Sequence, residues 1–149
     1  MTALPDWMRP PRAEGWFAED LDRLPEAPRH TELIDGALVF MMSPQRWWHG
    51  HLVTMLTVAL MEQVPADTRV GHEMTIKLDP RNRPEPDLLV TTADFDGDRT
   101  WFAPEDVQLV IEVVSPESAH RGIFRGTLQR PVPFQISLDL DTLTPPLSG

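Results

Sequence analysis

Two short apolar runs decide the fold of this chain: PDLLV at residues 86–90 and VQLVIEVV at residues 107–114. Both are rich in Leu, Val and Ile and are bounded by Pro or charged turn residues, a pattern typical of strands buried in a sheet. The second run contains one carboxylate, Glu112, and the first begins with Pro and Asp87. Ionised carboxylates in apolar surroundings are costly unless they are paired or bound to a metal. These two residues are therefore the first candidates for a functional site.

Adjacent strands would bring Asp87 and Glu112 together, and a pair of carboxylates suits a hard divalent cation with oxygen ligands. Each residue also has a structural interpretation. An Asp after Pro commonly caps a turn. Glu112 shares one strand face with Gln108, Val110 and Val114, and that face could reach solvent. The apolar neighbours of Glu112 favour a buried face instead, and the two carboxylates together favour a site.

Length and composition indicate a globular domain with extended ends. The chain has 149 residues, with 41% hydrophobic and 24% charged residues, which is one domain's worth and ordinary for a soluble protein. Proline is abundant, at 16 residues, against a usual share of roughly 5%, and much of it lies near the two ends. We therefore expect a disordered arm over residues 1–11, a single domain over 12–141 and a disordered tail over 142–149.

Several protein classes are excluded by the sequence. No apolar run of about 18 residues is present for a membrane span, and the N-terminus lacks the pattern of a signal peptide. A cytoplasmic location follows by default. The chain has no cysteine, so a metal would have to use Asp, Glu, His or backbone oxygens.

The net charge of −10 argues against an open, nonspecific nucleic-acid surface, which needs a basic footprint. Local basic groups remain that could line a groove, although scattered arginines are more often a solvated surface. These groups are Arg81, Arg83, Arg121, Arg125 and Arg130.

The remaining elements follow from periodicity and turn residues. Residues 12–24 predict a short amphipathic helix ended by Pro25, and residues 32–40 a hairpin that turns at Asp35-Gly36. A long helix is expected from Ser43, as its cap, to Val64. Alternation predicts a half-buried strand over residues 70–78 and another over 134–141. Trp101 and Phe102 are expected to pin the loop between the two central strands.

The order of these pieces resembles the Uma2 family of endonucleases, a branch of the PD-(D/E)XK restriction-endonuclease-like fold. The resemblance covers roughly residues 20–121. It implies a mixed α/β (α+β) fold, a restriction-endonuclease-like core with a central mixed sheet flanked by helices, incomplete on its C-terminal side. The matching segments are Glu32–Gly36, Met42-Ser43-Pro44 leading into a helix with His49, Pro86–Val90, and Glu112–Ser118.

By this resemblance, Asp87 and Glu112 are metal ligands and catalytic residues, the cofactor is Mg²⁺ (or Mn²⁺), and the substrate is DNA. Glu32 matches an early acidic position and is assigned a supporting role toward the metal or its water; the alternative is a hairpin-edge carboxylate facing solvent. His49 is assigned a contact to phosphate or to Glu32, against the alternative of a structural histidine. His51 is discounted as its partner, because residues two apart on a helix do not share a face.

One departure from the family bears on activity. Family members continue past the Ser-Pro motif into a helix that carries a lysine, whereas here Arg121 is followed at once by Gly122–Gly126. The chain therefore resembles a family member with an internal deletion after Arg121. Its one lysine, Lys77, lies outside the expected place and is given no catalytic role.

Two functions follow, from different classes. The first is a metal-dependent DNA endonuclease. The second is a non-catalytic remnant that binds a partner or self-associates as a homodimer, because a missing element leaves an apolar face uncovered. A glycosidase with two carboxylates is a weaker third.

Overall fold

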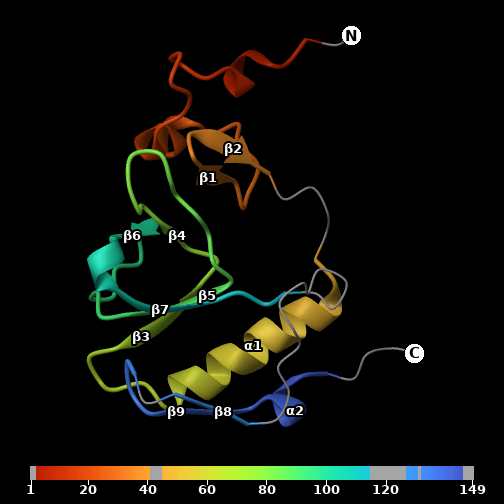
Figure 1. Cartoon of the computed structure of the whole chain (residues 1–149), viewed down its shortest axis with the longest axis vertical. Coiled ribbons are helices and arrows are strands. Elements are labelled where there is room, and N and C mark those ends of the chain that lie inside the picture. The colour runs from red at the N-terminus through yellow and green to blue at the C-terminus, as the bar shows by residue number, and fades with distance from the viewer. Residues whose placement is uncertain (1–2, 41–44, 115–126, 131, 146–149) are drawn as a thin grey trace.

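The computed structural model describes residues 3–40, 45–114, 127–130 and 132–145. The chain adopts a mixed α+β fold (Figure 1), as the sequence predicts. Within these residues, no helix combines the length and apolarity needed to cross a bilayer. The elements are η1 (Asp6–Met8), η2 (Ala18–Arg23), β1 (Glu32–Ile34), β2 (Ala37–Val39), α1 (Trp47–Met61), β3 (Arg69–His72), β4 (Thr75–Ile76), β5 (Leu88–Thr91), β6 (Trp101–Phe102), η3 (Pro104–Asp106), β7 (Val107–Ile111), β8 (Thr127–Arg130), β9 (Ile136–Asp139) and α2 (Leu140–Leu143).

A three-stranded sheet lies at the centre of the fold, in the order β3-β5-β7. Both neighbours of β5 run antiparallel to it, and all four residues of β5 are buried. A strand covered on both faces needs apolar side chains at every position rather than an alternation. This explains why residues 88–90 form a continuous apolar run.

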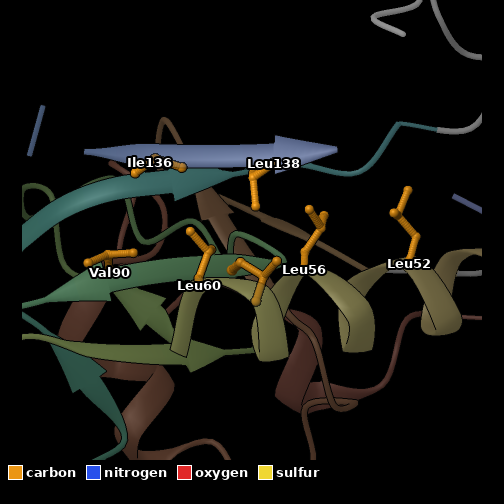
Figure 2. Packing of buried hydrophobic residues seen from close by; sticks show 7 residues of the cluster. Leu52, Leu56, Leu60, Val90, Ile136 and Leu138 are labelled. Atoms are coloured by element: carbon orange, nitrogen blue, oxygen red, sulfur yellow. The ribbon is translucent and has the colours of Figure 1, made fainter. Parts of the chain in front are cut away.

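One face of this sheet packs against α1. Leucines spaced four residues apart, Leu52, Leu56 and Leu60, meet Val90 of β5 and Leu138 of β9 in the main core cluster (Figure 2). Residues four apart lie on one side of a helix, so the predicted helix periodicity is what makes this contact. Gln63, just beyond α1, fixes β9 through two bonds to the backbone of residue 137, of 2.9 and 2.7 Å.

The other face is covered by short strands rather than by a second helix. Leu89 packs with Ile76 and Phe102 in a separate cluster, and β4 pairs in parallel with β6. In the described residues this is the one parallel pairing, and it lies in a sheet of its own. The expectation of a central mixed sheet flanked by helices is therefore wrong in this detail: the described central sheet is antiparallel, because each neighbour of β5 runs opposite to it. The prediction that Phe102 pins the connecting loop is confirmed, because its side chain is buried in this cluster. Trp101 is held through the backbone pairing of β6 with β4, and its side chain is exposed.

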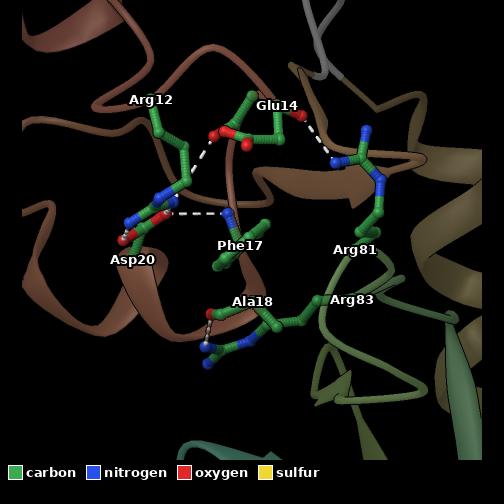
Figure 3. Close-up of polar contacts among 8 residues, drawn as sticks. Arg12, Glu14, Phe17, Ala18, Asp20, Arg81 and Arg83 are labelled. Carbon is green, nitrogen blue, oxygen red and sulfur yellow. Dashed lines mark hydrogen bonds and ion pairs between the residues drawn. The ribbon is translucent and has the colours of Figure 1, made fainter.

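The predicted hairpin is confirmed. β1 and β2 pair antiparallel around Asp35 and Gly36, which have φ of 48° and 79°. Two consecutive residues with positive φ form the turn that matches the twist of a two-residue hairpin. The hairpin is joined to the rest of the fold through Arg81, which donates to the carbonyl of Asp35 at 2.9 Å and to that of Glu14 at 2.5 Å. Figure 3 shows the bond to Glu14.

Three predicted elements differ in extent. The expected 12–24 helix is only the 3-10 helix η2, because Asp20 accepts from the backbone of Phe17 and is held by Arg12, which fixes a single tight turn. The expected 70–78 strand is interrupted at Glu73, where φ is +55°, so β3 and β4 join different sheets. The long helix begins at Trp47 rather than at residue 43, and its N-cap residue, Arg46, makes no capping bond with its side chain.

The C-terminal part forms a hairpin whose first strand the sequence does not predict. β8 pairs antiparallel with β9, which lies within the predicted 134–141 strand, and α2 follows directly. At the N-terminal end, in the segment expected to be disordered, η1 forms and the ring of Trp7 lies edge-on to Phe40 at 5.9 Å between centroids. The proposed deletion after Arg121 falls in residues 115–126, outside the described residues.

Replacement of glycine by alanine is expected to have opposite effects on stability at two positions. Gly15 has φ of +98°, and a Cβ there would lie 2.6 Å from the carbonyl oxygen of Gly36. We expect Gly15→Ala to lower the free energy of unfolding by about 1–3 kcal/mol. Gly50 lies in α1, and a Cβ there would meet no atom within 4 Å, so Gly50→Ala should raise it by about 0.5–1 kcal/mol. Urea denaturation measures both, and effects of the same sign and size would contradict these backbone assignments.

Candidate metal centre

The two carboxylates singled out by the sequence lie opposite each other at one end of the central sheet. Leu88 of β5 pairs with Ile111 of β7 in antiparallel register. Continuing that register by one residue places Asp87 opposite Glu112. Directly opposed residues have Cβ atoms about 4.5–5.5 Å apart, which brings the two carboxyl groups close enough to influence each other's ionisation.

Asp87 is fixed by contacts from two other segments. Its Oδ2 accepts a hydrogen bond from the backbone N–H of Val113 at 2.7 Å. His49, in the first turn of α1, places Nε2 3.3 Å from the same oxygen. The sequence assigned His49 to phosphate or to Glu32, and the contact found is with Asp87. Figure 1 shows the end of β7 reaching the start of α1, which explains how these segments meet.

Glu112 differs from the expectation in its surroundings. It follows the last residue of β7, and it lies on the exposed face with Gln108, Val110 and Val114, so the prediction of a buried face was wrong. The reason is that the main core packs on the opposite face, against Leu109, Ile111 and Val113, whereas the face that carries Val110 is exposed in the described part of the chain. Val110 and Val114 are 48% and 53% exposed.

Although its strand face is exposed, the Glu112 carboxyl group is partly shielded from water. Partial burial, followed by the negative charges of Asp87 and Glu32, the hydrogen bond to Asp87 and the charge of Glu85, raises the pKa of Glu112 to about 7. Like charges held close together disfavour ionisation. This end of the sheet is thus a region of concentrated negative potential.

Glu32 is half-buried rather than facing solvent, and its Oε1 accepts the backbone N–H of Glu85 at 2.7 Å. The bond forms because β1 lies along the segment that leads into β5, where Leu33 and Arg83 exchange two backbone bonds of 3.1 and 2.8 Å. Glu32 therefore stands beside the Asp87–Glu112 pair.

The sequence patterns did not single out one carboxylate of the cluster, Glu85, or its partner His30. Glu85 Oε2 lies 2.9 Å from Nδ1 of His30, and burial is the main cause of a raised pKa of Glu85. The sequence spacing does indicate where these two residues lie. In an extended segment, residues two apart share a side, so Glu85 accompanies Asp87 and His30 accompanies Glu32.

The donor set fits a weakly held hard cation. Among the described residues, no three His, Asp or Glu side chains converge closely enough to enclose a metal by themselves. Magnesium is usually bound by one or two carboxylates together with waters and substrate phosphates. The opposed Asp87 and Glu112 supply such a pair.

The basic residues proposed for a groove are used elsewhere. Arg83 is buried, and Arg81 holds the hairpin. Arg130 is exposed and donates to the backbone of its neighbour Gln129. Arg121 and Arg125 lie outside the described residues. Lys77 binds Asp22 at 2.7 Å and lies over the ring of Trp101, so its ammonium group is committed away from the carboxylate pair.

A protein-family model for Uma2, described as "Putative restriction endonuclease", matches residues 18–123. The chain belongs to the Uma2 family. The match includes Glu32, His49, Asp87 and Glu112, and ends before β8. No curated protein matches the chain.

Membership of the Uma2 family agrees with the mixed α+β architecture. It confirms the resemblance seen in the sequence. A family of this description points to nucleases, to DNA as the substrate and to divalent-metal use. The four family-matched residues come from β1, α1, the start of β5 and the end of β7, so the fold gathers them from segments that are distant in sequence.

Proposed function

We propose that this Uma2 protein is a metal-dependent DNA endonuclease whose divalent cation, Mg²⁺ or Mn²⁺, is held by Asp87 and Glu112. The observation that carries the proposal is the cross-strand opposition of these two carboxylates within the segment matched by the family. When bound, the cation would supply Lewis-acid stabilisation of phosphoryl charge and a more acidic water.

Other residues would position the two ligands and add negative charge beside them. Val113 and His49 hold Asp87 in place through one oxygen, which leaves Oδ1 for a ligand role. Glu32 and Glu85 add negative charge beside the pair and thereby favour a cation there. Glu32 stays the supporting residue of the site, with its orientation set by the backbone N–H of residue 85.

Calorimetric titration with MgCl₂ and MnCl₂ tests the site directly. Wild-type protein is expected to bind one of these ions, and Asp87→Ala and Glu112→Ala to bind at least 100-fold more weakly, because each removes half of the charged ligands. Cleavage of plasmid DNA should fall with binding. The matched control is Glu105→Ala, an exposed carboxylate in η3. Unchanged binding and cleavage in both site variants would rule out this assignment.

His49 is expected to act through Asp87. We predict that His49→Ala weakens Mg²⁺ binding about 10- to 100-fold, the usual cost of removing a group that orients a metal ligand, while the fold is retained. His51→Ala, two positions along α1 on an exposed position, serves as the control. Calorimetry and far-ultraviolet circular dichroism measure the two quantities, and equal metal affinities of the two variants would contradict the role.

A second candidate function is a non-catalytic module that binds a partner or a second copy of the chain. It is supported by the commitment of Lys77, the one lysine of the sequence, to Asp22 and Trp101. The exposure of Val110 in β7 and of Val114 beyond it also supports it. We propose an internal deletion after Arg121 as its origin; the family match ends close by, at residue 123. A light-scattering mass of one chain together with Mg²⁺ binding would exclude the module, whereas a dimer without metal binding would favour it.

A further inference from the structure

A cavity of about 200 Å³ adjoins the carboxylate cluster. Its apolar lining comes from η2 and the segment that follows, and includes Leu21, Leu24 and Pro28. Its polar lining includes His30, Thr31, Glu73 and Glu85. Glu85 thus belongs both to the cavity and to the charge cluster around Glu112.

The polar residues of the cavity lining offer mainly hydrogen-bond acceptors. Glu85 uses Oε2 for His30 and keeps Oε1, and within the described residues the Glu73 carboxylate accepts no hydrogen bond. Thr31 donates its hydroxyl to the Pro28 carbonyl at 2.6 Å, which leaves its oxygen as an acceptor. Arg83 also lines the cavity, and its Nε and Nη1 groups donate to Thr75, Ala18 and Asp22. A ligand that fits therefore has an apolar face and donors at its edge.

The cavity lies within one or two nucleotides of the proposed metal site. Glu85 and Asp87 are two residues apart in an extended segment, which spans roughly 6–7 Å. Nucleotides of one strand in a duplex follow each other every 3.4 Å or so, and unstacked nucleotides are further apart. A base next to a phosphodiester at Asp87 and Glu112 therefore reaches the cavity.

We propose that this cavity receives a nucleobase that carries an exocyclic amino group: cytosine, adenine or guanine. The inference rests on the proposed function in taking DNA as the substrate, and it adds a base-recognition site. Carboxylates accept hydrogen bonds from exocyclic amino groups, and apolar side chains cover the face of an unstacked base. Thymine presents carbonyl oxygens at the corresponding positions of its edge, which face the carboxylates unfavourably.

The test uses the full chain in EDTA, with cytidine and thymidine as probes, and follows backbone amide signals by ¹H–¹⁵N NMR. Cytidine is expected to shift the amides of Thr31, Glu73 and Thr75, and thymidine to bind at least fivefold more weakly. Glu73→Gln should weaken cytidine binding at least fivefold, and Thr100→Phe should block the cavity from its exposed rim. Glu105→Gln and Thr92→Phe are the matched exposed controls and should bind as wild type does.

Three results would overturn the proposal: no shift with either nucleoside, equal binding of cytidine and thymidine, or shifts of the same amides by putrescine but not by cytidine. The last result would identify a site for organic cations. Because the titration contains no metal and needs no cleavage, its outcome is separate from that of the proposed function. Cytidine binding without Mg²⁺ binding would refute the nuclease, and Mg²⁺-dependent cleavage without cytidine binding would refute the base site.

Discussion

Arg83→Met is expected to lower the free energy of unfolding by about 3 kcal/mol, the lower end of the range for breaking a buried ion pair. Arg83 is 5% exposed. It donates to Asp22 at 2.7 Å, to the hydroxyl of Thr75 at 2.9 Å and to the carbonyl of Ala18 at 2.9 Å. Figure 3 shows the bond to Ala18. Its loss removes the link between η2 and β4. The lower end applies because Asp22 keeps Lys77 as a second cation.

Urea denaturation of Arg83→Met, Arg83→Lys and Arg29→Met distinguishes the causes. Arg29 is exposed, so its replacement should change stability by less than about 0.5 kcal/mol. Arg83→Lys keeps the charge but cannot supply the forked set of donors, and an intermediate loss is expected. If Arg83→Met were as stable as wild type, η2 would be held by its apolar contacts alone.

The second large effect has the opposite sign. In metal-free protein at pH 8, Glu112→Gln should raise the free energy of unfolding by about 1–2 kcal/mol while removing the proposed metal site. Folding raises the pKa of Glu112 from 4.5 to about 7, which corresponds to at most about 3 kcal/mol. The side chain is more than a third exposed, and solvent screening reduces that figure.

The pH range follows from the direction of the pKa change. A group whose pKa is higher in the folded state contributes fully below its unfolded value of 4.5 and loses that contribution as pH rises to about 7 and beyond. Wild type is therefore expected to lose stability relative to Glu112→Gln between these limits, and the two should agree near pH 4. Denaturation from pH 4 to pH 8 measures the difference, with Glu105→Gln as the control. Parallel profiles for Glu112→Gln and wild type would contradict the prediction.

A loss of stability in the metal-free protein is expected where carboxylates are gathered to bind a cation. Four carboxylates, Glu32, Glu85, Asp87 and Glu112, are held within electrostatic reach of one another, at a cost that a divalent cation at the proposed site would offset. Binding to the folded state alone stabilises it in proportion to the logarithm of ligand concentration over the dissociation constant. Added Mg²⁺ is therefore expected to remove the stability advantage of Glu112→Gln.

Local pattern was enough for the elements whose signals lie within a few residues. Positive φ at the Asp35-Gly36 turn favours particular residue types. Helical spacing likewise requires the leucines of α1, and burial on both faces requires the apolar run of β5. These three elements can therefore be predicted from short stretches of sequence. The same patterns identified Asp87 and Glu112, since a carboxylate in an apolar run is conspicuous. Their opposition followed from assuming that two consecutive strands are neighbours.

Sequence alone determined the composition of this protein's core strands, its main helix, its hairpin and its first two candidate ligands. Tertiary structure alone decided that β7 is an edge strand with Glu112 on its open face, that His49 contacts Asp87, and that Glu85 and His30 join the cluster. It also decided that Lys77 is bound elsewhere. The physical reason is that exposure, ion pairing and shared electrostatic potential depend on which segments meet in space, and residues as distant as 30 and 85 carry no local record of that meeting.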